Sequence, residues 1–570
     1  MATFYVQLKD RLLQISGELT ADNISNALGY TPSSFSGEFE DLQNNPIIKS
    51  SQKDINIVDE DGNIIAVINN LGIQSSDFVA DAHKLSEKAN LTDIPNSVSQ
   101  LTNDSEYISG DVVDDIIDEI NGTTTNNSSK VSILYVNASI GSDSNKGTKN
   151  SPKKTFASAI QDGGDIITII FEGDTTERLN LKQKSSLSKL VVIGAGGKRN
   201  RIISGTKLTS FTQYSSGIYQ IEIAHTNLSN TNYNIYQHDV NDSNTLISDS
   251  EKHASQKGRK YRKQSKKLDR VSSLSALSSA SNYSFYYDNS NKKLYVKTTN
   301  TNFNTNPIML PTDAGGIYGN DGTCQVELYN VEVWYAPLIA NQCNGGLLVD
   351  CSAKFALGTG GIRYDDSLGI RFIRCEACAT NNLSGYGDGI NGHSYLDNSL
   401  NANSNRHLYV SAEMIDCWCH DNDDDGWSDH TGCKSILRGG LYEYNKKGGV
   451  TPSGGVSCEC YNVLSRKNYR GFYYISSTST TKEPDGEFYV QNCVSMNNSI
   501  AGFDTLSNGS SLKVYCQLID CKSIDDKVGF KAGSYCIMKL IDCSVLNAQT
   551  IKECDSTATQ TIITTTKLNS

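Results

Sequence analysis

The chain has 570 residues and a formal net charge of −12, with 20% charged and 37% hydrophobic residues. Its acidity argues against nucleic acid as a general partner, because phosphate binding needs a basic face. No apolar run reaches the roughly 18 residues of a membrane span, and the first ten residues lack the basic and apolar regions of a signal peptide, so neither feature is expected.

The composition favours many short strands joined by polar turns. Glycine occurs 46 times, and Asn, Ser and Thr are spread along the whole chain. A chain of this length usually forms several domains, but a solenoid grows by adding coils and so reaches this length with one continuous core.

Residues 1–130 contain small modules. Three segments resemble repeats of phage tail-fibre proteins, in the usual order: Ala21–Pro32, Gly37–Ile48 and Leu91–Tyr107. Between them, alternating apolar and polar residues around Asp61-Gly62 predict a hairpin. The resemblance implies a slender N-terminal stalk that attaches to other virion proteins. An ordinary linker with one hairpin is the alternative.

Residues 111–121 predict a short helical neck. Four apolar side chains share one face of this helix: Val113, Ile116, Ile117 and Ile120. Isoleucine at both heptad core positions favours three strands, so we expect a homotrimer. The Thr/Asn/Ser run 123–129 would then be a hinge.

The segment Ile133–Ile160 resembles the entry of pectate-lyase-like right-handed parallel β-helix proteins, in which a helical turn caps the open end. Residues 167–177 and 189–205 read as the first two coils. Residues 206–312 interrupt them with a hairpin at 285–298, and resemble an inserted β-rich subdomain of glycan-active β-helix proteins. The basic run Lys252–Arg270 would contact an acidic polysaccharide or be a solvated loop.

From Gln325 onward a repeat decides the fold. Each unit is an apolar strand, often ending in Asp-Cys or Asn-Cys, then a polar turn, then Gly and an apolar residue. Most intervals are about 22 to 31 residues, which suits one solenoid coil. The members are Cys351, Cys375, Cys417, Cys493, Cys521 and Cys543, and Gly389, Gly426, Gly449, Gly471, Gly502 and Gly529.

We therefore predict an all-β chain, a right-handed parallel β-helix preceded by a fibre-like stalk. The predicted divisions are the stalk 1–130, the entry and first coils 131–205, the insertion 206–312, the main coils 313–547 and a C-terminal cap 548–570.

All 16 cysteines lie from Cys324 onward. Without a secretion signal, disulfides are disfavoured. Zinc is one interpretation of the close pairs, and small hydrophobic side chains in a stacked core are the favoured one. We therefore assign no metal ligand and no cofactor to them. The pairs are Cys375/Cys378, Cys417/Cys419 and Cys458/Cys460.

The candidate site comes from two coils that share a register. Aligned on the repeated glycine, Asp388 stacks over Asp425 and His393 over His430, whereas the next coil has neither residue. Two carboxylates about 5 Å apart are the arrangement of retaining glycosidases, and a histidine can assist or act as the base of a lyase. We predict that all four are catalytic and share an exposed face.

Further residues are predicted to contact a sugar: Arg363, Trp427, Asp429, Glu443, Tyr444 and Lys447. A segment around Asn398–Arg406 would wall one side of the groove. Structural roles remain the alternative, since Asp ladders can cap turns, and Asp421–Asp425 could hold a divalent cation.

The blocks 423–433 and 439–455 resemble β-helix proteins of phage tails and gut bacteria that act on glycans. The resemblance implies a virion protein of the tail or capsid, made in the host cytoplasm. Such a tailspike or fibre would serve host attachment by binding surface polysaccharide, as a receptor-binding protein with or without depolymerase activity. The alternatives are a non-catalytic adhesive fibre and a bacterial polysaccharide lyase or hydrolase.

Overall fold

The computed structural model divides the chain into two compact units, Met1–Ile108 and Ser109–Ser570. It describes residues 3–8, 11–16, 54–58, 64–69, 72–75, 131–195, 200–238, 265–319, 322–343, 345–393, 411–430, 433–476, 485–507 and 513–555. The predicted fibre repeats, the helix 111–121, the hinge 123–129 and the segment Asn398–Arg406 lie outside these residues.

The first unit contains an antiparallel sheet in the order β2-β1-β3-β4-β5. The hairpin predicted around Asp61-Gly62 is confirmed, since β3 pairs antiparallel with β4. The strands are β1 (Thr3–Leu8), β2 (Arg11–Ser16), β3 (Asp54–Val58), β4 (Ile64–Asn69) and β5 (Gly72–Ser75).

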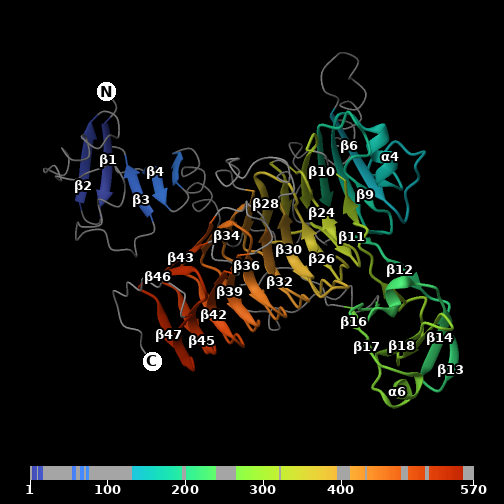
Figure 1. Ribbon diagram of the computed structural model, residues 1–570. Coiled ribbons are helices and arrows are strands. Elements are labelled where there is room, and N and C mark those ends of the chain that lie inside the picture. Colours follow the sequence, from blue (N-terminus) through green and yellow to red (C-terminus); the bar gives the residue numbers. More distant parts are fainter. Residues whose placement is uncertain are drawn as a thin grey trace, which may run out of the picture. The chain divides into compact units, whose positions relative to one another are not determined.

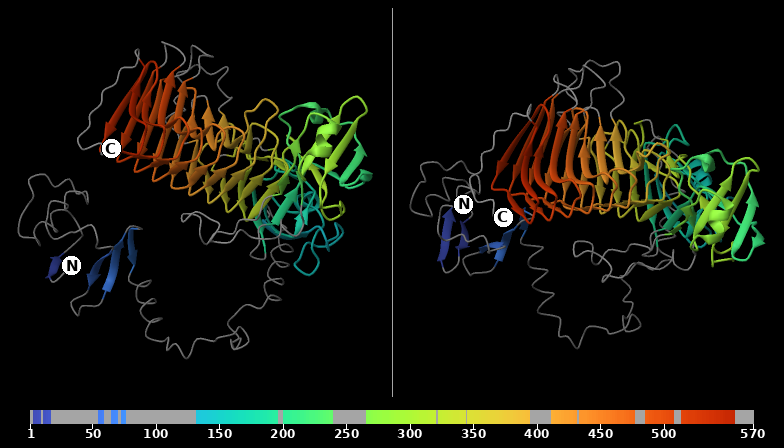
Figure 2. Two further views of the ribbon diagram at one scale, coloured as in Figure 1. Left: turned by 90° about the horizontal axis from the view of Figure 1, so that it is seen from below. Right: turned by 60° about the horizontal axis from the view of Figure 1, so that its bottom comes forward.

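The second unit is a parallel β-helix, as predicted (Figures 1 and 2). After the first strand, β6, each coil supplies one strand to each of three parallel sheets, and successive coils pair in register. Neither α4 (Phe156–Asp162) nor any other helix within the described residues has the length and apolarity needed to cross a membrane.

The three sheets run the length of the solenoid. The first sheet contains β6 (Val131–Asn137), β7 (Ile166–Glu172), β10 (Lys189–Gly194), β22 (Gln325–Tyr329), β25 (Leu347–Val349), β28 (Ile370–Ile373), β31 (Ala412–Ile415), β34 (Lys434–Arg438), β37 (Ser457–Tyr461), β40 (Gly486–Gln491), β43 (Val514–Ile519) and β46 (Cys536–Ile541). The second contains β8 (Asp174–Thr175), β11 (Asn200–Ile203), β23 (Val331–Trp334), β26 (Ser352–Lys354), β29 (Glu376–Cys378), β32 (Trp418–His420), β35 (Leu441–Glu443), β38 (Leu464–Arg466), β41 (Val494–Met496), β44 (Lys522–Ile524) and β47 (Ser544–Leu546). The third contains β9 (Leu179–Asn180), β21 (Ile317–Tyr318), β24 (Leu338–Ile339), β27 (Gly360–Arg363), β30 (Asp388–His393), β33 (Trp427–His430), β36 (Gly448–Pro452), β39 (Arg470–Ser476), β42 (Ala501–Ser507), β45 (Val528–Ala532) and β48 (Thr550–Cys554).

The core begins at the helical cap. Phe156, Ala159 and Ile160 of α4 are fully buried and belong to the same apolar cluster as the side chains of the last coils. The helix therefore covers the first coil, as a solenoid end requires.

The Asp-Cys and Asn-Cys motifs form the turn between the first and second sheets. Asp350, Asp416 and Asp520 have φ between 51° and 53°, the left-handed region that Asp and Asn tolerate better than most residues. The following cysteines point inward and form one ladder, as predicted. In register order the ladder is Cys351, Cys375, Cys417, Gly440, Val463, Cys493, Cys521 and Cys543.

The repeated glycines lie at the start of the third-sheet strands, as Gly389 does in β30, and Gly426 lies directly before β33. A Cβ atom on Gly389 would lie 2.4 Å from the carbonyl oxygen of Gly426, so the next coil approaches too closely for a side chain. The apolar residues after the glycines stack inside. Phe472 and Phe503, for example, have ring centroids 4.8 Å apart.

A ladder of buried amides holds the turn between the second and third sheets. Asn422 donates to Asn445 (2.9 Å), Asn445 to Asn468 (3.0 Å) and Asn498 to Asp526 (2.9 Å). Each side chain also accepts a backbone N–H from the preceding coil, as in Asn468 N to Asn498 Oδ1 (2.8 Å). Buried polar groups thus find partners between coils.

The insertion docks beside the second sheet. Asn234 N donates to Asn381 Oδ1 (3.2 Å), and Tyr236 packs with Trp334, Tyr335 and Phe355. Its elements are β12 (Thr206–Leu208), β13 (Thr212–Ser215), β14 (Ile218–Glu222), η3 (Thr226–Ser229), β15 (Tyr236–Gln237), β16 (Lys266–Lys267), β17 (Asp269–Arg270), α6 (Leu274–Ser279), β18 (Ser284–Asp288), β19 (Lys293–Lys297) and β20 (Ile308–Leu310). The hairpin predicted at 285–298 is β18 with β19.

Candidate functional site

The site lies on the third sheet, where β30 and β33 run side by side. Strand pairing aligns His393 with His430, and the same register sets Asp388 opposite Asp425. The backbone N–H of Asp425 donates to the carboxylate of Asp388 at 3.1 Å. The two coils that share the sequence register therefore bring their acidic side chains together.

A third carboxylate completes this group. Asp388, Asp424 and Asp425 each place one oxygen within 4.8 Å of the other two, and we call them the carboxylate trio. Their residues are 5%, 6% and 7% exposed. Asp425 accepts the backbone N–H of Gly448 (2.6 Å), and Lys447 Nζ forms an ion pair with Asp424 (2.8 Å). The trio is the carboxylate set that could also hold a cation.

Burial and mutual repulsion keep protons on the trio. Burial, followed by the charge of Asp424, raises the pKa of Asp388 to about 8. Burial, with the charges of Asp388 and Asp424, raises the pKa of Asp425 well above its usual range. Burial also raises the pKa of Asp424, but Lys447 opposes this. At neutral pH the trio therefore retains a proton, and Asp424 is the member whose ionised form a cation supports.

The side chain of Asn391 is placed to share that proton. Its Nδ2 lies 2.7 Å from Asp388 Oδ2, and its buried Oδ1 has no hydrogen-bond partner among the described residues. Amide nitrogen and oxygen are exchangeable by a half-turn of the group. After such a turn Asn391 would accept a hydrogen bond from protonated Asp388.

The two histidine rings are neighbours at the end of the strands and are tilted by 43° to each other. Their ring centroids are 4.3 Å apart. The ring nitrogens of His430 hydrogen-bond with Ser428 (2.6 Å) and with Ser453, and Nε2 lies 4.0 Å from Asp388 Oδ2. Burial lowers the pKa of both histidines to about 4, and the neighbouring ring contributes for His393. Both rings are therefore neutral at physiological pH.

Exposed side chains border the trio on one side. The Lys447 side chain is 47% exposed, and its Nζ lies 4.5 Å above the ring of Tyr386, which is 59% exposed. On the other side, Arg363 pairs in register with Asn391 and forms an ion pair with Asp365. A cation and an aromatic face are groups that bind polar sugars from the solvent side.

No model of a known protein family matches the sequence, and no curated protein matches it. Solved structures that resemble the chain include a glycoside hydrolase (10% identity, TM-score 0.42, covering 75% of this chain and 97% of that one). Others are XylC with xylose (12% identity, TM-score 0.38, covering 75% and 86%) and a rhamnogalacturonan lyase (11% identity, TM-score 0.33, covering 76% and 84%).

Two residues predicted to contact a sugar lie in the core instead. Trp427 is fully buried and its Nε1 donates to Tyr364 Oη at 3.2 Å. Asp429 is also fully buried and accepts a hydrogen bond from Ser435, and burial raises its pKa to about 7. Alternation along β33 turns both side chains inward, which the sequence register alone did not reveal.

Two other expectations need correction. The carboxylates of Asp388 and Asp425 are on one face but are buried rather than exposed. Glu443 is 4% exposed, and it accepts hydrogen bonds from Trp418 and Arg466. Glu443 lies on the second sheet, and its carboxylate holds neighbouring strands together instead of facing a sugar.

Tyr444 is exposed, but its hydroxyl accepts a hydrogen bond from Lys467 Nζ (2.6 Å). This hydrogen bond leaves the ring of Tyr444 exposed, and its contact with a sugar stays a prediction.

The acidic run Asp421–Asp425 divides among several partners. Asp421 Oδ2 forms a hydrogen bond with His420 Nδ1 (2.7 Å), and Asp423 forms an ion pair with Lys446. Only Asp424 and Asp425 join the trio. The run therefore does not wrap around one ion as a calcium loop does.

The sequence reasoning missed Asp424, Asn391 and Tyr386. The alignment on Gly426 matched Asp425 to Asp388 and assigned no partner to Asp424, so Asp424 was not predicted. The three consecutive aspartates at 423–425 could have indicated it, because a single turn seldom exposes three adjacent side chains to solvent. Nothing in the sequence singled out Tyr386.

Proposed function

We propose that this protein binds a polysaccharide and cleaves it by acid–base chemistry at the carboxylate trio. The observation that carries this proposal is the convergence of three buried carboxylates on one face of two coils. The register of the next coil sets Lys447 opposite Asp424 and Gly448 opposite Asp425, so the solenoid scaffold does not require the acidic group. Groups with strongly raised pKa values and neighbouring charges are candidate functional sites.

The spacing fits a double-displacement hydrolysis. Retaining glycosidases hold two carboxyl groups about 5–5.5 Å apart, and the trio brings one oxygen of each carboxyl group within 4.8 Å of the others. Asp388 would donate its proton to the glycosidic oxygen while the Asp424 carboxylate bonds to the anomeric carbon and the C–O bond breaks. Water would then displace Asp424 from that carbon and return a proton to Asp388.

The charges around the trio support these roles. Asp388 is the proton donor because burial keeps it protonated at neutral pH. Asp424 is the nucleophile because the ammonium of Lys447 favours its ionised form. The charges of Asp388 and Asp424 both raise the pKa of Asp425, so the three carboxyl groups titrate together and protonation of one favours ionisation of another.

The test uses the full chain and a panel of purified neutral and uronic-acid polysaccharides. Reducing ends report hydrolysis, and ultraviolet absorbance of unsaturated uronates reports a lyase. We expect Asp388→Asn and Asp424→Asn to lose about 10²- to 10⁴-fold in rate, with binding retained. Asp525→Asn, in an exposed turn, is the matched control. Equal rates in all four proteins would disprove the proposal.

A non-catalytic adhesive fibre is the second candidate. It is favoured by the side chains of Asp388 and Asp425, which each accept a backbone N–H of the following coil and so also serve the scaffold. In that case the panel yields binding without new reducing ends. Asp388→Asn keeps one side-chain oxygen that can accept the N–H of Asp425, and both Asn variants keep full affinity.

We also propose that the chain acts as a homotrimeric spike or fibre of a phage particle. The support is the resemblance of residues 1–130 to tail-fibre repeats and the isoleucine face of 111–121. Sedimentation of the full chain at micromolar concentration should give a trimer. A stable monomer would contradict this assembly without affecting the proposed cleavage.

A further inference from the structure

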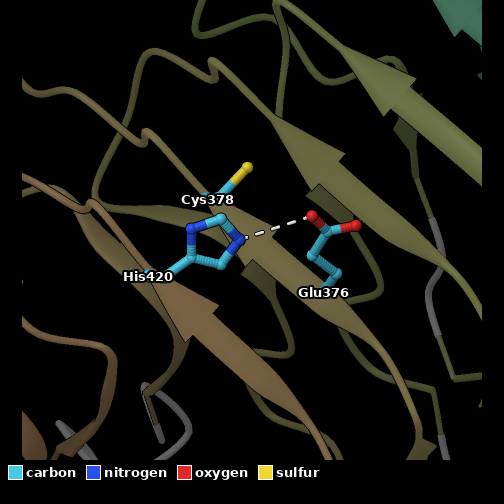
Figure 3. A group of neighbouring side chains, drawn as sticks. All are labelled: Glu376, Cys378 and His420. Atoms are coloured by element: carbon cyan, nitrogen blue, oxygen red, sulfur yellow. Dashed lines mark hydrogen bonds and ion pairs between the residues drawn. The ribbon is translucent and has the colours of Figure 1, made fainter. Parts of the chain in front are cut away.

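The second sheet carries a buried cluster that the carboxylate trio does not use. Glu376 and Cys378 lie two residues apart on β29, so both side chains stand on one face of the strand. His420 on β32 pairs directly with Cys378. All three residues are at most 3% exposed. Figure 3 shows the Glu376 carboxylate facing the His420 ring, with Cys378 beside it.

We propose that Glu376, Cys378 and His420 bind a zinc ion that joins two successive coils. A carboxylate oxygen, the thiol sulfur and an imidazole nitrogen all lie within 4.8 Å of one another. Thiolate, imidazole and carboxylate are the three ligand types that zinc takes in proteins, whereas calcium and magnesium prefer oxygen alone. A water molecule would fill the fourth position.

The hydrogen bonds of His420 select the nitrogen that faces the metal. Its Nδ1 lies 2.7 Å from Asp421 Oδ2, the distance of a good N–H···O bond. That bond places the proton on Nδ1 and leaves the lone pair of Nε2 directed toward Glu376. A carboxylate that orients a ligating histidine in this way is a common outer contact of zinc sites. Trp418 stacks on the ring at 3.9 Å and fixes its plane.

One distance separates a metal site from a simple ion pair. Charge-assisted N–H···O bonds are about 2.7–2.9 Å long, but Glu376 Oε1 and His420 Nε2 are 3.4 Å apart. Two ligands on a tetrahedral zinc with bonds of about 2.0–2.1 Å lie about 3.3 Å from each other. The spacing therefore suits two ligands of one ion better than a donor and its acceptor.

The charges in the cluster also balance around zinc. Zn²⁺ with the Cys378 thiolate and the Glu376 carboxylate is neutral. Lys354 Nζ donates to Glu376 Oε1 (2.8 Å), and the buried carboxylate of Glu332 acts on the same ammonium and offsets its charge. A carboxylate oxygen has lone pairs for both a lysine N–H and a metal. No buried net charge then remains.

The test measures metal directly on the whole chain. Protein produced with zinc in the medium should contain one zinc per chain by mass spectrometry of the metal. After exchange for cobalt it should show a thiolate-to-cobalt charge-transfer band and the visible bands of tetrahedral cobalt. Cys378→Ser should lose the band, whereas Cys375→Ser, a core-facing cysteine of the same coil, should keep it.

A second variant tests the orienting contact. Asp421→Asn should weaken zinc affinity about 10- to 100-fold and leave the charge-transfer band in place at saturating cobalt. Wild-type protein without bound zinc and without a thiolate band would overturn the proposal, and it would leave His420 as a partner of Glu376 and Asp421 only. This wild-type result decides the matter even if the Cys378 variant fails to fold.

Discussion

Asp388 accepts the backbone N–H of Asp425 from the following coil, although burial holds a proton on the same carboxyl group at neutral pH. One oxygen of Asp388 thus accepts a hydrogen bond that joins the two coils, while the other carries the proton that titrates. This double use makes the stability of the solenoid depend on pH at this position.

We expect wild-type protein to lose stability as the pH rises toward 8. The folded pKa of Asp388 is raised to about 8, whereas an unfolded aspartate titrates near about 3.9. The folded state therefore binds more protons between these values. The contribution is complete below the lower pKa and is lost as pH passes through the upper one. The slope of melting temperature against pH should be smaller in Asp388→Asn, where Asp425 and Asp429 still have raised pKa values, and unchanged in Asp525→Asn. A wild-type melting temperature that does not change from pH 4 to 8 would contradict the assignment.

Replacement of Lys447 should act through Asp424. Without the ammonium, the ionised carboxylate loses its counter-charge and the pKa of Asp424 rises. In Lys447→Met the acid limb of the cleavage profile should move up by about one pH unit, whereas Lys447→Arg should restore it. An acid limb that stays in place in the Met variant would show that Lys447 contacts only the substrate.

Trp427→Phe should change stability and leave glycan binding unchanged. Its buried ring and its hydrogen bond to Tyr364 lie inside the coils, so the smaller ring should cost about 1–3 kcal/mol. Urea denaturation measures this cost, and affinity chromatography on the polysaccharide measures binding. Tyr386→Phe, on the exposed rim, is the contrasting variant. Weaker glycan binding by the Trp427 variant at full stability would return this residue to the binding surface.

The amide ladder should be most sensitive at its centre. Asn445→Ala removes the partner of both Asn422 and Asn468, and an unsatisfied buried polar group costs about 1–3 kcal/mol. Asn547→Ala, which removes one exposed hydrogen bond to Asp525, should cost far less. The urea midpoints of the two variants provide the comparison, and similar midpoints would argue against the ladder as a stabilising element.

The fold was accessible from the sequence because the solenoid repeats its constraints. An Asp or Asn before five of the six ladder cysteines marks a left-handed turn residue, and Arg374 takes the same conformation before Cys375. The glycine before Phe472 or Phe503 marks a close approach of coils. The amide ladder left an equally regular signal, with Asn or Asp three or four residues before each glycine, from Asn422 to Asp526. That pattern explains why polar residues are spaced so evenly.

The candidate site was only partly accessible, because register predicts proximity and not burial. Alignment correctly put Asp388 beside Asp425, but it could not show that Trp427 and Asp429 turn inward while His430 turns outward. Glu376 and His420 are far apart in sequence and belong to different motifs. Their meeting depends on a segment of about 40 residues between two coils, whose length gives no hint of the register.

The cysteine ladder allows the opening of individual coils to be measured by thiol chemistry. Of the free cysteines within the described residues, those from Cys324 to Cys543 are buried and Cys554 is exposed. A buried thiol reacts only when its own coil opens. Alkylation followed by peptide mapping would therefore give an opening rate for most coils in a single experiment. Those rates would show whether the solenoid frays from one end or opens first beside the carboxylate trio.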